Sequence, residues 1–163
     1  MLRILTMAGG LAGAAALSQY PEYSQQYVQR MAGQLDALSL VVEDFDASAL
    51  NAGLTQGEAL AQMQGSDFLE ARQSDMQRAF ARHARLSADF AALQAADEMQ
   101  RMLMPHRMAD LETAQGTWAD FKPAVPLTVS GAVSAGAGYL GGYGLVAAIL
   151  ALMAWPFRRQ RRV

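Results

Sequence analysis

The chain has 163 residues, a formal net charge of −2 and no cysteine. Its length fits one compact domain, and the lack of cysteine excludes disulfides, thiolate catalysis and cysteine metal sites. The charge is unevenly placed, because residues 22–122 hold all 15 acidic residues while both ends carry only basic ones. This asymmetry is typical of a protein placed in a membrane, and an acidic middle segment argues against binding nucleic acid.

A first hydrophobic segment runs from Ile4 to Tyr20 and is rich in small residues. It is short enough to be a signal peptide, with Arg3 before it and small residues for cleavage between Ala14 and Ser18. We favour an uncleaved transmembrane anchor over residues 1–21, and a cleaved signal peptide is the alternative. Aromatic residues typical of a membrane interface follow: Tyr20, Tyr23 and Tyr27.

Residues 22–122 are predicted to be helical throughout. The first helix carries a seam of apolar residues in alternating steps of three and four, as in a coiled coil. It is predicted to end near Gly53, and the pattern from Thr55 to Glu58 is a capping box that opens a short helix. A long helix is predicted from about Asp67 to Met104, where Pro105 interrupts it. The seam consists of Val28, Met31, Leu35, Leu38, Val42 and Phe45.

The long helix carries one matching apolar stripe. Two narrow stripes predict a thin helical hairpin, which needs further burial by self-association or by a partner. A last amphipathic stretch, which includes Leu111 and Trp118, could lie along the membrane surface. The stripe of the long helix consists of Met76, Ala79, Phe80, His83, Leu86, Phe90 and Leu93.

A second hydrophobic segment runs from about Leu127 to Phe157 and exceeds the roughly 20 residues that a bilayer core requires. Residues 123–163 are therefore predicted to form a C-terminal transmembrane helix with a basic tail. Such a tail marks the cytoplasmic side, because cytoplasmic loops are enriched in lysine and arginine. The topology anchors are Arg158, Arg159, Arg161 and Arg162.

The predicted fold is all-α, with two transmembrane helices flanking an extracytoplasmic helical hairpin with a coiled-coil-like seam. Two spans place both termini on the same side of the membrane. The expected location is a bacterial inner membrane, with both termini cytoplasmic and residues 22–122 periplasmic.

Small residues in both predicted spans have the spacing of close helix packing. Ser134, Gly138 and Gly142 share one face of the second span, and Gly9 and Gly13 repeat the four-residue spacing in the first. Such faces let two helix backbones approach closely in lipid. Either the two spans pack on each other, or these faces meet copies of the chain or partner proteins. The sequence leaves both interpretations open.

No pattern in the sequence predicts an enzyme or a cofactor. The stretch Gly136–Gly141 matches the dinucleotide fingerprint G-x-G-x-x-G, but no acidic residue follows it. Asp44 and Asp46 resemble the start of a calcium loop that lacks the required glycine and glutamate. His83 lies in the apolar stripe, where a histidine is more often packed and hydrogen-bonded than catalytic.

A cationic edge on the long helix is formed by Arg78, Arg82 and Arg85. Its expected partners are neighbours on the same helix, Asp75 for Arg78 and Asp89 for Arg85, which suits a solvated face with local ion pairs. Binding of an acidic partner is the alternative.

A methionine-rich stretch supplies the leading alternative function, a periplasmic Cu(I) carrier. Thioether and imidazole groups are the soft ligands that select Cu(I). Methionine at helical spacing is also an ordinary core residue. The sequence therefore favours packing over a metal site at this stretch. The candidate ligands are Met99, Met102, Met104, His106 and Met108.

Four stretches occur in order along the chain: QYVQRMAGQLD, RLSADFAALQAADEMQRMLMP, RMADLETAQGTW and PAVPLTVSGAV. From Gln19 to about Val133 they resemble domain-of-unknown-function family 2937, a group of small bacterial inner-membrane proteins. The resemblance implies two spans around an extracytoplasmic helical segment, and it carries over no catalytic or ligand residue.

The sequence therefore predicts a non-enzymatic inner-membrane protein that self-associates or serves as an accessory or scaffold subunit of a membrane assembly. Its expected partners are membrane lipid and either further copies of the chain or a larger inner-membrane complex. No nucleic acid and no cofactor are expected.

Overall fold

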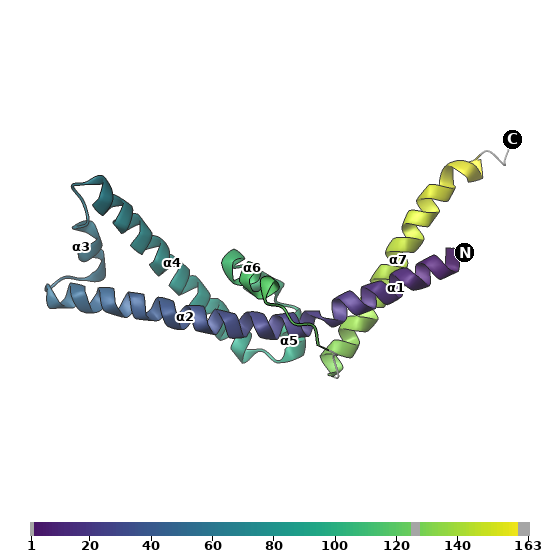
Figure 1. The fold of residues 1–163 in the computed structure, drawn as a ribbon, viewed down its shortest axis with the longest axis horizontal. Coiled ribbons are helices and arrows are strands. Elements are labelled where there is room, and N and C mark those ends of the chain that lie inside the picture. The colour runs from purple at the N-terminus through teal and green to yellow at the C-terminus, as the bar shows by residue number, and fades with distance from the viewer. Residues whose placement is uncertain (1, 125–127, 160–163) are drawn as a thin grey trace. The chain divides into compact units, whose positions relative to one another are not determined.

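A computed structural model describes residues 2–124 and 128–159, with side chains through Trp155. Within these ranges every regular element is helical, which confirms the predicted all-α class. The elements are α1 (Leu2–Ser18), α2 (Tyr20–Asn51), α3 (Gln56–Ala61), α4 (Asp67–Ala95), α5 (Glu98–Met102), the 3-10 helix η1 (Pro105–Met108), α6 (Leu111–Ala119) and α7 (Val129–Arg159) (Figure 1).

The chain divides into two compact units. The span unit contains Met1–Gln25, Glu98–Leu103 and Asp120–Val163, so both ends of the chain belong to it. The hairpin unit contains Gln26–Asp97 and Met104–Ala119.

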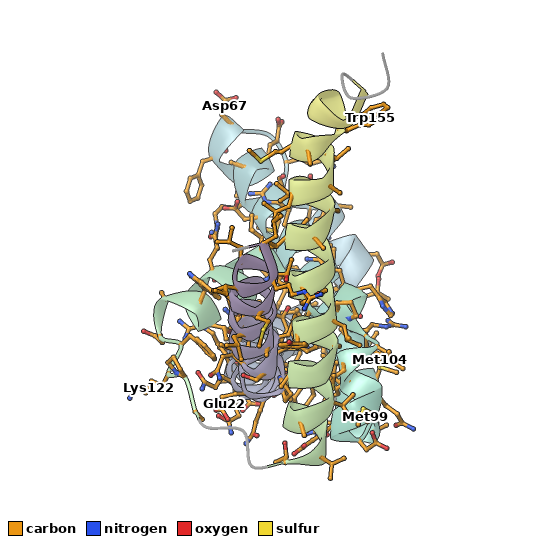
Figure 2. All side chains as sticks on the ribbon, turned by 90° about the vertical axis from the view of Figure 1, so that its right-hand side faces the viewer. Glu22, Asp67, Met99, Met104, Lys122 and Trp155 are labelled. Atoms are coloured by element: carbon orange, nitrogen blue, oxygen red, sulfur yellow. The ribbon has the colours of Figure 1, made fainter. Side chains whose placement is uncertain are left out.

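In the span unit, α1 and α7 lie side by side and run antiparallel (Figure 2). Among the described helices, one is long and apolar enough to cross a membrane, α7 over the 27 residues Val129–Trp155. α1 has 17 residues, at the lower limit of the roughly 17–25 that span a bilayer. A first span therefore stays a prediction. The side chains of Arg158 and Arg159, and the whole of Arg161 and Arg162, lie outside the described residues.

In the hairpin unit, α2 and α4 pair antiparallel. The rings of Phe45 and Phe80 meet edge to face, with centroids 5.1 Å apart, and the Ser39 hydroxyl lies 3.0 Å from His83 Nε2. Of the six predicted seam residues only Met31 is fully buried, while the other five are half-buried. The hairpin is as thin as the two narrow stripes suggest.

The connection from α2 to α4 follows the predicted turn chemistry. Gly53 has φ of +72°, a conformation that glycine adopts without steric cost. The predicted capping box is confirmed, since the Thr55 hydroxyl accepts from the Glu58 backbone N–H and the Glu58 carboxylate accepts from the Thr55 backbone N–H. α3 then lies between the ends of α2 and α4 (Figure 1), and Gln73 Nε2 donates to the Leu60 carbonyl at 2.7 Å.

The prediction of one long helix from Asp67 to Met104 is wrong. α4 ends at Ala95, Ala96 is extended with ψ of 139°, and a separate short helix, α5, begins at Glu98. Asp97 stands immediately before α5, at a position where aspartate favours a helix start because its carboxylate can accept from free backbone N–H groups. Apolar periodicity continues through this local start signal and therefore conceals the break.

The face of α6 toward the rest of the hairpin unit is polar. Thr113 and Thr117 are its buried residues, whereas Leu111 and Trp118 are 68% and 73% exposed. These two apolar residues therefore point away from the unit.

Candidate functional site

The small residues of the predicted packing faces come together between α1 and α7. A Cβ atom built on Gly13 would overlap the carbonyl of Gly138, and one built on Gly142 would overlap the carbonyl of Gly9. Ser134 continues this face and is 3% exposed. The two helix backbones therefore touch directly, so only residues without a side chain fit at these positions.

Other glycines of α7 lie on open faces. A Cβ on Gly136, Gly141 or Gly144 would meet no atom within 4 Å. In the structure α1 of the same chain occupies the glycine face of α7, as in the interpretation that the two spans pack on each other. A contact of this face with another copy would require α1 to leave.

Side chains also tie α5 to the start of α7. Ser130 Oγ donates to Glu98 Oε2 at 2.6 Å, and Ser134 Oγ donates to the sulfur of Met102 at 3.5 Å. Within the part of the chain described, the methionine-rich stretch therefore serves packing at two points, because Met108 is buried in the hairpin unit as well. No group of three or more histidine, aspartate or glutamate residues that could hold a metal occurs among the described residues. The Cu(I) carrier stays an alternative prediction, since its candidate ligands are mainly methionines.

A polar junction in the hairpin unit joins α2, α4 and α6 around Asp110. Arg82 donates two hydrogen bonds to the Asp110 carboxylate, Nη2 to Oδ1 at 2.9 Å and Nε to Oδ2 at 3.3 Å. Thr113 donates its backbone N–H to Oδ1 at 3.1 Å, so Asp110 also caps the start of α6. Arg85 Nη2 lies 3.5 Å from Oδ2. One buried carboxylate, 8% exposed, thus holds two arginines of α4 and the first turn of α6.

α2 completes this junction with two side chains. Gln34 Oε1 accepts from Arg82 Nη2 at 3.3 Å and from the Thr113 hydroxyl. The Tyr27 hydroxyl accepts the backbone N–H of Asp110 at 3.2 Å, and Tyr27 is fully buried. The prediction that Tyr27 belongs to an aromatic belt at the membrane interface is therefore wrong. Its ring is part of the hairpin core, and its hydroxyl has a backbone donor there.

The electrostatics of the junction favour the charged forms of both partners. Burial alone would raise the pKa of Asp110, but hydrogen bonds from Arg82 and Thr113 outweigh it and hold this pKa far below its usual range. The pKa of Arg82 is raised, chiefly by its hydrogen bond to Asp110. An ionised, fully satisfied buried pair of this kind fixes the relative position of the elements that carry it.

The residues considered as candidates for catalysis or calcium binding make contacts that stabilise the fold. His83 is half-buried in the seam beside Ser39 of the facing helix, as expected for a packed and hydrogen-bonded histidine. Asp44 and Asp46 lie within helix α2, where Asp46 Oδ1 accepts from Gln56 at 2.7 Å. Neither group has the loop geometry of a calcium site.

The chain matches the family described as Protein of unknown function (DUF2937) over residues 1–159. It belongs to this family. The match confirms the resemblance seen from Gln19 to Val133 and extends it to α1 and the whole of α7. No curated protein and no solved structure matches the chain.

In this DUF2937 chain the hairpin unit exposes large apolar side chains outside its core. Leu40 and Val41 on α2 are 62% and 43% exposed, Leu50 at the end of α2 is 76% exposed, and Phe68 at the start of α4 is 71% exposed. Leu40 lies about 140° around the helix from the seam residue Leu35, at 100° per residue. α2 therefore exposes a leucine, set between Asp36 and Asp44, on a side that its own hairpin does not cover.

Proposed function

We propose that this chain is a non-enzymatic inner-membrane protein that self-associates, or acts as an accessory or scaffold subunit, through its extracytoplasmic hairpin. The observation that carries the proposal is the exposure of Leu40 and Val41 outside the hairpin's own contact, on a part of the helix that we call the α2 edge. The glycine face cannot serve the same purpose while α1 fills it. Association of copies through the α2 edge is the form of the proposal that we develop.

The proposed placement in the membrane rests on α7 and on charge. α7 is long and apolar enough to span, and Trp155 lies near its C-terminal end, where aromatic residues are enriched at membrane interfaces (Figure 2). The antiparallel pairing of α1 with α7 supports a second span and both termini on one side. The arginine-rich tail then assigns that side to the cytoplasm and residues 22–122 to the periplasm.

Reporter fusions test this topology. A reporter that is active only in the cytoplasm is expected to work at the C-terminus, and one that is active only in the periplasm is expected to work when inserted at Gly53. Gly53 is exposed and lies in a turn, so an insertion there should leave the hairpin intact. A periplasmic C-terminus would refute the topology. Loss of the first 16–18 residues from the mature chain, read from its intact mass, would establish the signal peptide instead.

The proposed association surface is the part of α2 that its own hairpin does not cover. On the side of the helix that carries Leu40, Gly33 and Ala37 are exposed and small, whereas Asp36 and Asp44, one turn before and after Leu40, are exposed carboxylates. Burying a leucine side chain fully is worth about 1.5–3 kcal/mol relative to leaving it in water. Pairing of two copies through this edge would therefore provide the burial that the thin hairpin lacks.

The variant Leu40→Glu is expected to shift the protein to a smaller species, since it would bring a carboxylate into an apolar contact. Mass measured by light scattering in mild detergent reads the assembly, and circular dichroism checks the fold. Leu111→Glu is the matched control, because Leu111 is similarly exposed but lies on α6. An unchanged mass for Leu40→Glu, or an equal shift for both variants, would remove the α2 edge as the association surface.

A further inference from the structure

A groove of about 270 Å³ lies between the first residues of α1 and the last turns of α7. Its size has a clear cause. Closer to the glycine contact the two backbones touch, whereas beyond Gly9 the α7 wall includes Ala147, Ala151 and Ala154, whose short side chains leave the space between the helices open. The residues that line it include Arg3, Thr6, Tyr143, Ala147, Ala151 and Ala154.

The chemistry of the groove is apolar along most of its length and cationic at Arg3. Its α7 wall is formed by alanines, Leu150 and the ring of Tyr143, and the Thr6 hydroxyl is already used, because it donates to the Arg3 carbonyl at 2.9 Å. The sequence has no acidic residue in 1–21 or 123–163 that could balance Arg3. The fitting ligand is therefore a molecule with both a hydrocarbon chain and a negative charge.

The length of the groove fits one leaflet of a bilayer. From Tyr143 to Ala154 the helix advances eleven residues, or about 16 Å at 1.5 Å per residue. Half of a typical hydrocarbon core is about 15 Å thick. An acyl chain that follows this wall from the leaflet surface would reach the middle of the membrane near Tyr143.

We propose that the groove between α1 and α7 binds one anionic phospholipid of the cytoplasmic leaflet. Its acyl chain lies along the alanines, and its phosphate meets the Arg3 guanidinium, whose planar N–H groups suit a phosphate. The proposal rests on the proposed membrane placement, which puts this end of the helix pair at the cytoplasmic surface. Basic sites between membrane helices on that side favour anionic headgroups.

The test uses the purified full-length protein in mild detergent. Native mass spectrometry measures the bound fraction after addition of phosphatidylglycerol or, separately, of phosphatidylcholine. We expect phosphatidylglycerol to be retained at least about tenfold better, which corresponds to about 1.4 kcal/mol. Equal retention of both lipids would overturn the proposal. Displacement by inorganic phosphate alone would also overturn it, because the site would then recognise a free anion and not a lipid.

Two variants locate the site. Ala147→Leu fills the groove and is expected to lower phosphatidylglycerol retention about tenfold, whereas Ala148→Leu places the same side chain on the exposed side of α7 and should leave it unchanged. Arg3→Gln should remove the preference for phosphatidylglycerol over phosphatidylcholine. Equal effects of Ala147→Leu and Ala148→Leu would place lipid binding elsewhere. The reporter fusions and the mass of the assembly are measured in parallel. Loss of lipid binding with an unchanged topology and mass would therefore count against the lipid site and not against the proposed function.

Discussion

Asp110→Ala is expected to lower the free energy of unfolding of the hairpin unit by about 3 kcal/mol, the lower end of the range for breaking a buried ion pair. The variant leaves Arg82 without its main partner and removes the cap of α6. The loss stays at the lower end because Arg82 keeps an ion pair with the exposed Glu112 at 2.6 Å. Thermal melts followed by circular dichroism of the full-length protein should show a midpoint of the hairpin unit about 12–24 °C lower.

Asp75→Ala is the control for this variant. Asp75 pairs with Arg72 and Arg78 at the surface, where its side chain is 44% exposed. Surface pairs contribute about 0–1 kcal/mol, so its melting midpoint should hardly change. Equal midpoints for Asp110→Ala and Asp75→Ala would show that the junction around Asp110 does not hold the hairpin unit together.

The Asp110 contribution should also depend on pH with a defined sign. The pKa of Asp110 is lower in the folded chain than its value in an unfolded chain, about 3.9. The stabilisation is therefore complete above about pH 4 and is lost as the pH falls toward the folded pKa. The difference in melting midpoint between the wild type and Asp110→Ala should be constant from pH 5 to 7 and shrink below about pH 4. A difference that grows on acidification would contradict the assigned charge state.

Gly138→Leu is expected to separate α1 from α7. The added side chain would collide with the backbone of Gly13, and a backbone cannot move aside as a flexible side chain can. The protein should still reach the membrane, because leucine is favourable in hydrocarbon. The chain has no cysteine, so a cysteine pair at Thr6 and Ala147, which line the same groove, reports the pairing by cross-linking. We expect efficient cross-linking in the parent and a loss of several-fold with Gly138→Leu.

Gly141→Leu provides the matched control for Gly138→Leu. A Cβ at Gly141 meets nothing within 4 Å, so the same substitution should leave the cross-link unchanged. Cross-linking that survives Gly138→Leu would mean that the glycine contact does not hold the two helices together. A cross-link that forms between chains and not within one chain would instead support contact between copies.

Local signals in the sequence predicted local structure well. The capping box at Thr55, the glycine turn before it and the four-residue spacing at Gly9 and Gly13 each depend on residues close in the sequence, and the structure has all three. The choice of partner for the glycine face was not predictable, because the same spacing fits another helix of the chain or of a second copy.

The junction around Asp110 could be predicted only in part. An aspartate three residues before Thr113 is a recognisable helix start and could have been predicted from the sequence. The arginine partners of Asp110 could not be predicted, because the spacing along one helix favoured an ion pair between Arg85 and Asp89. In the structure Asp89 pairs with Arg107 of η1 at 2.9 Å, and Arg85 turns to Asp110. The break of α4 at Ala95 redirects the chain and brings these distant residues into reach.

The glycine contact between α1 and α7 also has a consequence for how the chain is made. Gly13 and Gly138 are about 125 residues apart, and ribosomes add roughly 5–20 residues per second. α1 therefore exists for about 6–25 s before the helix that it packs against has been synthesised. During that interval the hairpin unit can fold completely, since all of its residues precede α7. Closure of α1 on α7 is then a late step of biogenesis, and variants at the glycines should accumulate as chains with a finished hairpin and an unpaired α1.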